Sequence, residues 1–93
     1  MRAKLAAPIF AALLGFACST APVQEMSDAR QAIDAAEVAA AGVDPPEELS
    51  QGKDLLDRAE QSLQQGDYEQ AREFAQSARS AAVTAREKAL AAR

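Results

Sequence analysis

Seven alanines recur at alternating spacings of four and three residues near the end of the chain, and this spacing constrains the fold more than any other feature. Such spacings place side chains on one face of an α-helix, at the positions where helices pack in pairs. Alanine side chains let helices approach closely but bury little apolar area each. The pattern predicts a long helix over residues 67–92 that needs partners along one face. This alanine seam consists of Ala71, Ala75, Ala78, Ala82, Ala85, Ala89 and Ala92.

The start of this long helix has its own signal. Asp67 is expected to cap the helix, and Gln70 completes a capping box three residues later. At about 1.5 Å per residue the helix should reach roughly 38 Å, which is longer than its expected neighbours can cover. We therefore expect residues 83–93 to overhang the neighbouring helices and to be available for binding.

A first helix is expected from Ser27, which can serve as N-cap, to Ala41. Gly42 supplies the left-handed position after its end, and Val43 is expected to fold back onto Val38 in a Schellman turn. The packing face of this helix is predicted to be Ala29, Ala32, Ala36 and Ala39.

A second helix is expected to open with Asp44 as N-cap, Pro45 at the first helical position and Glu47 in a capping box, and to end at Gln65. Gly52 lies on its apolar face. A glycine there indicates either close approach of another backbone or an ordinary surface position. The apolar face consists of Leu49, Gly52, Leu56, Ala59 and Leu63, widened by Leu55.

No segment alternates between apolar and polar residues with period two, so strands are not expected. The three helices predict an all-α domain over residues 27–93. Its expected form is a small antiparallel three-helix bundle or helical hairpin with alanine-rich heptad seams.

Residues 1–17 have the pattern of a secretory signal peptide. Arg2 and Lys4 precede an apolar run of thirteen residues, which is shorter than the roughly 20 residues that span a bilayer. Cys18 follows this run directly. The stretch Leu-Gly-Phe-Ala-Cys at residues 14–18 resembles a bacterial lipobox, in which the cysteine becomes the lipidated first residue of the mature protein. Ordinary cleavage beside small residues is the alternative.

The expected lipid anchor fixes a location. Cys18 would carry the acyl chains, and residues 18–26 are expected to form a flexible tether. In lipoproteins of this kind an Asp after the cysteine retains the protein in the inner membrane. Because Ser19 stands there, we expect a protein of the cell outer membrane that faces the periplasm.

The composition excludes most kinds of catalytic and metal-binding site. The chain has no His and one Cys, so no metal site, no cofactor and no catalytic residues are expected, and the protein is not expected to be an enzyme. The formal net charge of −4 argues against nucleic acid as a partner.

A row of arginines repeats every seven residues beside the alanine seam. These side chains could pair with acids of a neighbouring helix or bind an anionic partner, and a solvated row is the simpler alternative. The candidate interaction surface is Arg72, Arg79, Arg86 and Arg93 together with Ala85, Ala89 and Ala92 of the expected overhang.

Two resemblances emerge from the motifs. The stretch 66–71, followed by Phe74, Ala75 and Ala78, resembles the first helix of a tetratricopeptide repeat, although only one unit is present and about three are usually needed for stability. The whole of residues 27–90 resembles the alanine-rich bacterial envelope lipoproteins known as domain of unknown function 4398. That likeness lies in the alanine helix ending at Gly42, the turn at Pro45 and Pro46, the face formed by Leu56, Ala59 and Leu63, and the Gly66-Asp67-Tyr68 turn.

The family resemblance implies a location and an architecture but no activity. We expect a structural or protein-interaction role in the envelope, through an envelope protein or self-association. One alternative is a murein-lipoprotein-like oligomer that binds peptidoglycan; because the last residue is Arg93 and not lysine, that binding would be noncovalent. Another is an adaptor built on a single tetratricopeptide-like unit.

Overall fold

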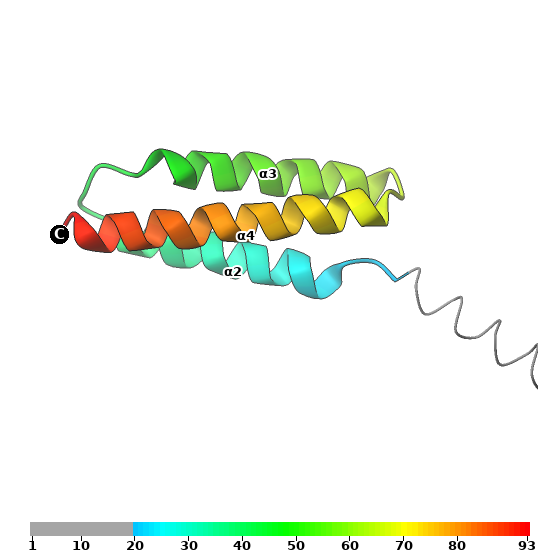
Figure 1. The fold of residues 1–93 in the computed structure, drawn as a ribbon, viewed down its shortest axis with the longest axis horizontal. Coiled ribbons are helices and arrows are strands. Elements are labelled where there is room, and N and C mark those ends of the chain that lie inside the picture. The colour runs from blue at the N-terminus through cyan, green and yellow to red at the C-terminus, as the bar shows by residue number, and fades with distance from the viewer. Residues whose placement is uncertain (1–19) are drawn as a thin grey trace, which may run out of the picture.

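The computed structural model describes residues 20–93, which form three helices (Figure 1). Helix α2 spans Val23–Ala39, α3 spans Glu47–Gln64 and α4 spans Tyr68–Ala91. Helix α4 packs along both other helices, which touch each other much less, and α3 runs antiparallel to the parallel pair α2 and α4. No strand occurs in residues 20–93, so the expected all-α three-helix bundle is confirmed. The predicted signal peptide and Cys18 lie outside the described residues.

The alanine seam forms the centre of the core. Six of its seven members are completely buried, from Ala71 to Ala89. One half of the core packs the seam against Met26, Ala29 and Ala59, and the other half packs it against Ile33, Ala36, Ala39, Ala40 and Leu49. The expected faces of α2 and α3 are therefore largely correct, with Met26 and Ile33 as buried members that the alanine pattern did not reveal.

Gly52 lies on the face of α3 that packs closely against α4. A Cβ atom at this position would lie 3.3 Å from the carbonyl oxygen of Ala78 and 3.5 Å from the backbone nitrogen of Ala82. Of the two interpretations of this glycine, close backbone approach is the correct one. The short side chains on both helices permit this approach, and the glycine costs about 1 kcal/mol of helix propensity relative to alanine.

The turn between α3 and α4 is a Schellman turn followed directly by a helix cap. Gly66 has a φ of 80°, its N–H donates to the carbonyl of Leu63, and the N–H of Asp67 donates to the carbonyl of Ser62. The Asp67 side chain then accepts a hydrogen bond from the Gln70 N–H at 3.2 Å. The predicted cap is thus confirmed, but the Asp67 N–H is already used by the turn and is not bonded to the Gln70 side chain.

The N-terminal boundary of α2 differs from the prediction. The helix begins at Val23 with Pro22 as N-cap, not at Ser27. Pro22 is almost completely buried, Met26 is 2% exposed, and the Met26 N–H donates to the carbonyl of Pro22. The expectation of a flexible tether through residue 26 is therefore wrong for residues 22–26, because burial of these apolar side chains outweighs the absence of a polar cap.

The connection between α2 and α3 also corrects two local predictions. Helix α3 begins at Glu47 with Pro46 as N-cap, so Asp44 does not cap it. The reason is that a residue before proline avoids the helical region, and Pro45 and Pro46 impose this on two successive residues. Gly42 has the expected positive φ of 84°, but Val43 packs on the core while Val38 is 72% exposed, so these two valines do not form the predicted contact.

The predicted overhang of α4 is wrong. Ala85 and Ala89 are completely buried against residues of α2 and of the connection that follows it. The last residue also reaches back, since the Arg93 guanidinium donates to the carbonyl of Ala41 at 3.5 Å. The seam is covered at this end because α2 runs parallel to α4 and ends at the same level. Residues 40–43 continue the packing beyond α2, and Leu49 at the start of α3 joins the same cluster.

The close packing of the seam makes a stability prediction. Replacing Ala78 by Leu should lower the free energy of unfolding by about 1–3 kcal/mol, because the added carbons have no space between α4 and the other helices. Ala35→Leu is the matched control, since Ala35 is exposed on α2 and should change stability by less than about 0.5 kcal/mol. Urea unfolding followed by circular dichroism measures both. Equal midpoints for the two variants would contradict the close-packed seam.

The arginine row as a candidate functional site

The arginine row lies along the boundary between α4 and α2. At one end, the Arg72 Nε atom lies 3.4 Å from a carboxylate oxygen of Glu25, and its guanidinium donates to the carbonyl of Thr20 at 3.2 Å. At the other end, Arg93 donates to the carbonyl of Ala41. The two outer arginines therefore hold the two ends of the α2 segment against α4.

The same two contacts define how α2 and α4 are aligned. Arg72 and Thr20 are 52 residues apart in the chain, and so are Arg93 and Ala41. Because the separation is the same at both ends, each residue of α2 lies at the level of the α4 residue 52 positions later in the chain. Residues of α2 can therefore be assigned to each level of α4.

This alignment explains why the two inner arginines are not bonded in the same way. At the levels of Arg79 and Arg86, the carbonyls equivalent to those of Thr20 and Ala41 belong to residues inside α2, where hydrogen bonds within the helix use them. The positions equivalent to Glu25, one and two heptads further along α2, are Ala32 and Ala39. The inner arginines thus have alanines at the positions equivalent to Glu25. Asp28 lies near them, but it accepts a hydrogen bond from Gln24 and forms no ion pair with either arginine.

No acid of α4 compensates for this. The residues three and four positions before and after Arg79 and Arg86 are alanines, Gln76, Val83 and Leu90. Ten Lys and Arg residues occur in the chain, of which Arg2 and Lys4 precede the described part. Five of the eight others form ion pairs. Within residues 20–93, Arg79 and Arg86 are the cations with neither an ion pair nor a hydrogen bond.

A shallow hollow of about 390 Å³ lies between the inner arginines and α2. Small and apolar side chains are present in it together with the two guanidinium groups, and Val83 is 41% exposed. Leu90 and Val38, one to two turns further along α4 and α2, are also exposed. The residues that line this α2–α4 hollow are Asp28, Gln31, Ala32, Ala35, Arg79, Val83 and Arg86.

The structure separates the members of the predicted interaction surface. Arg79 and Arg86 line the hollow, whereas Arg72 and Arg93 are engaged by α2. Ala85 and Ala89 cannot belong to a contact surface because they are buried in the core. Ala92 is exposed at the C-cap of α4, away from the residues that line the hollow, and Cys18 lies outside the described residues.

Sequence reasoning did not find the α2 side of the hollow. Asp28, Gln31 and Ala35 carry no motif, and they join the site only through the alignment of α2 with α4. The available signal was the heptad spacing from Glu25 to Ala32 and Ala39, which becomes informative once the pairing of Glu25 with Arg72 is known.

Three further observations on the described chain concern metal binding, buried polar groups and membrane spans. Residues 20–93 contain no group of three or more acidic or cysteine side chains placed to hold a metal ion. Every buried side-chain nitrogen or oxygen of these residues has a hydrogen-bond partner. None of the three helices is both long enough and apolar enough to cross a membrane.

Fold and site together define a small three-helix bundle with an alanine core and a cationic hollow on one side. Residues 24–93 match the model of the family described as Domain of unknown function (DUF4398), and the chain belongs to this family. The resemblance found in the sequence motifs is thereby confirmed. No curated protein and no solved structure matches the chain.

The ion pair between Lys88 of α4 and Glu48 of α3 makes the stability depend on pH. The hydrogen bond from Lys88, together with a backbone hydrogen bond, lowers the pKa of Glu48 below its ordinary value of 4.5. A lowered pKa in the folded state stabilises the fold above the unfolded-state pKa, and this stabilisation disappears as the pH falls through the folded-state value. Lys88→Gln should therefore melt below the wild type at pH 7, with the difference closing below pH 4.5.

A double-mutant cycle provides the control for this prediction. Glu48→Gln should produce a similar loss at pH 7, and the variant with both changes should lose little more than either alone, because the two residues act as a pair. Thermal melts between pH 7 and pH 3 measure these differences. Additive losses, or a difference that persists unchanged at pH 3, would contradict the assignment.

Proposed function

We propose that this protein is an outer-membrane lipoprotein that faces the periplasm and binds an acidic helix of an envelope protein in the α2–α4 hollow. The observation that carries the proposal is the pair of inner arginines, Arg79 and Arg86, which lack partners among residues 20–93 in a chain where acids outnumber cations. The role is structural or adaptor-like, without catalysis.

The geometry favours a helical partner. Arg79 and Arg86 are seven residues apart, which is about 10.5 Å along α4. Two carboxylates seven residues apart on another helix have the same separation, and guanidinium groups bind carboxylates with two parallel hydrogen bonds. Between the arginines, Ala32 and Ala35 provide a surface that another helix can approach closely.

The expected affinity is modest. Ion pairs at exposed positions contribute about 0.2–1 kcal/mol each, so the two arginines alone give weak binding. Contact of apolar partner residues with Val83 and the alanines adds to it. Confinement of both proteins to one membrane would raise their effective concentration and make such binding sufficient.

The proposed location rests on the sequence before the bundle. The basic start, the apolar run of thirteen residues and the cysteine that follows support processing as a lipoprotein, and Ser19 supports sorting to the outer membrane. Acyl chains on Cys18 would anchor the domain without an apolar surface, because each buried methylene contributes about 0.8 kcal/mol.

Lipidation is tested by metabolic labelling with palmitate. The wild type is expected to incorporate the label and to fractionate with the outer membrane. Cys18→Ala should incorporate none and should accumulate as an uncleaved precursor, because lipoprotein signal peptidase requires the modified cysteine. If the Cys18→Ala protein is cleaved normally, or if the wild type takes up no label, lipidation is refuted and the protein is a secreted protein without a lipid anchor.

Partner binding is tested with a photo-crosslinking amino acid at Ala35, inside the hollow. We expect a discrete crosslinked product that disappears when Arg79→Gln and Arg86→Gln are introduced together, because the carboxylates of the partner then lose both guanidinium groups. Arg30→Gln with Arg58→Gln is the matched control. It removes the same charge from arginines that already form ion pairs away from the hollow.

The outcomes separate the candidate partners. A crosslinked protein with an acidic helix supports the proposal, and a crosslinked second copy of this chain assigns the hollow to self-association. Binding of purified sacculi that requires Arg79 and Arg86 would instead favour peptidoglycan. If the crosslinked product is also lost in the control variant, binding depends on the net charge of the protein and not on the hollow.

A further inference from the structure

The described chain is fixed to the bundle from its first residue onward. Arg72 donates to the carbonyl of Thr20, the Val23 N–H donates to the carbonyl of Ala21 at 2.9 Å, and Pro22 is buried. Glu25, one turn into α2, forms an ion pair with the same arginine. Residues 20–26 therefore belong to the folded domain and do not serve as a tether.

This arrangement leaves little chain between the bundle and the proposed anchor. Ser19 alone separates Cys18 from Thr20, and two peptide steps span at most about 7 Å. The start of the described chain lies at the same end of the bundle as the α3–α4 turn (Figure 1). An acyl group on Cys18 would hold this end close to the bilayer.

We infer that the domain stands end-on on the phospholipid surface, with the α3–α4 turn and Tyr68 at the level of the headgroups. This inference rests on the lipidation of Cys18 in the proposed function and adds an orientation to it. The far end of α4, which is 24 residues long, then projects about 36 Å from the membrane. The α2–α4 hollow lies between the two ends and faces sideways.

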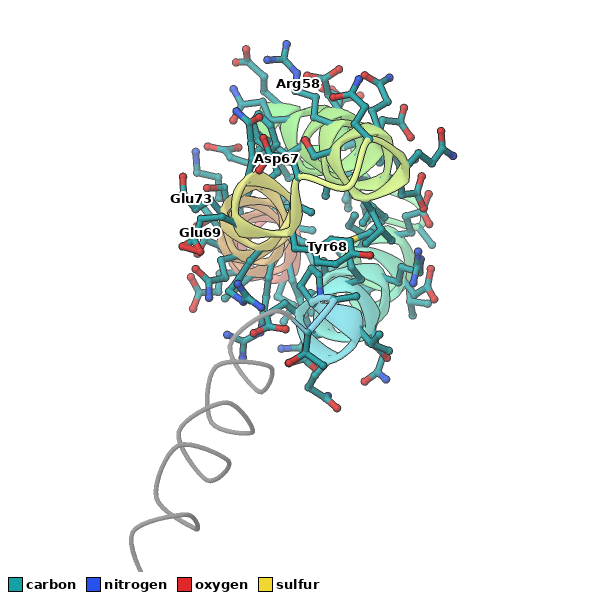
Figure 2. All side chains as sticks on the ribbon, turned by 90° about the vertical axis from the view of Figure 1, so that its right-hand side faces the viewer. Arg58, Asp67, Tyr68, Glu69 and Glu73 are labelled. Atoms are coloured by element: carbon teal, nitrogen blue, oxygen red, sulfur yellow. The ribbon has the colours of Figure 1, made fainter. Side chains whose placement is uncertain are left out.

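The residues of this end fit a zwitterionic headgroup surface. Tyr68 begins α4, is 38% exposed and lies across the end of the bundle (Figure 2). Tyrosine rings favour the headgroup region, because they combine an apolar ring with a polar hydroxyl group. Asp67 lies at the same end, and Glu69 and Glu73 lie on the outer side of α4, away from Tyr68 (Figure 2). These acids would be repelled by anionic lipid, so the contact depends on the short anchor and not on charge attraction.

The chain contains its own probe for this orientation. Tyr68 is the sole tyrosine and there is no tryptophan, so tyrosine emission reports on this end alone. The full lipidated protein is reconstituted into phosphatidylcholine vesicles with or without a headgroup spin label. We expect a clear loss of Tyr68 emission in the labelled vesicles, and a smaller loss when anionic phosphatidylglycerol is added.

A matched variant reports on the opposite end. Tyr68→Phe combined with Leu90→Tyr moves the probe about 33 Å along α4 to another exposed position, and its emission should not change with the label. Quenching at both positions would show that the bundle lies flat on the membrane. Quenching at neither would show that the domain is held away from it. Either result overturns the end-on orientation.

An insertion tests the short connection directly. Twenty Gly and Ser residues placed between Ser19 and Thr20 would have a root-mean-square length of about 25 Å, and should abolish quenching of Tyr68. Unchanged quenching would mean that Tyr68 contacts lipid without help from the anchor, which overturns the inference. Vesicle flotation distinguishes this inference from the proposed lipid anchor. Wild-type protein that does not float, or that carries no acyl chain, refutes lipid anchoring. Acylated protein that floats but shows no quenching of Tyr68 refutes only the orientation.

Discussion

The close approach of α3 to α4 at Gly52 is the contact on which the rest of the structure depends. With no side chain at Gly52 and only methyl groups at Ala78 and Ala82, the two backbones approach so closely that even a methyl group at position 52 would lie 3.3 Å from the carbonyl oxygen of Ala78. Helices at this separation leave no space for larger side chains, so the stability of the bundle comes from many small contacts. Larger apolar residues, such as Met26, Ile33 and Leu49, enter the core from α2 and α3, where they pack against the alanines.

The arginine row shows how a repeated residue can have two roles along one helix. Arg72 and Arg93 lie at the levels where α2 begins and ends, and there the backbone presents carbonyls that no helix bond requires. Arg79 and Arg86 lie at levels where α2 is helical and has alanine in place of Glu25. The ends of the row hold the bundle together, and its middle remains available to an anionic group from outside.

The order at the N-terminal end links the fold to the proposed location. Because Thr20 and Pro22 are held by α4 and the core, the attachment point of the chain coincides with one end of the bundle. An anchor placed there would fix which end meets the membrane, and the hollow would face molecules beside the protein. A binding surface oriented in this way suits an adaptor that joins neighbouring envelope components.

Much of this protein is determined locally and could be predicted from the sequence alone. The spacing of the alanines requires a helix with one packed face, and Gly42 and Gly66 adopt the positive φ that their positions demand. Asp67 caps α4 because the turn at Gly66 starts the helix directly after it, where its carboxylate meets a free N–H group. Each of these features depends on interactions within a few residues, so the sequence specifies it directly.

Only the tertiary structure decided where α2 begins, whether the end of α4 is covered and which arginines stay unpaired. Pro22 and Met26 become helical or capping residues because the other helices bury them. Ala85 and Ala89 are covered because the last two turns of α2 and the start of α3 pack on them. Arg79 and Arg86 are chemically identical to Arg72, but Arg72 has Glu25 of α2 opposite it and Glu69 on its own helix, whereas the inner arginines form no ion pair with either helix. That alignment is set by packing between residues about 50 positions apart, which no local pattern contains.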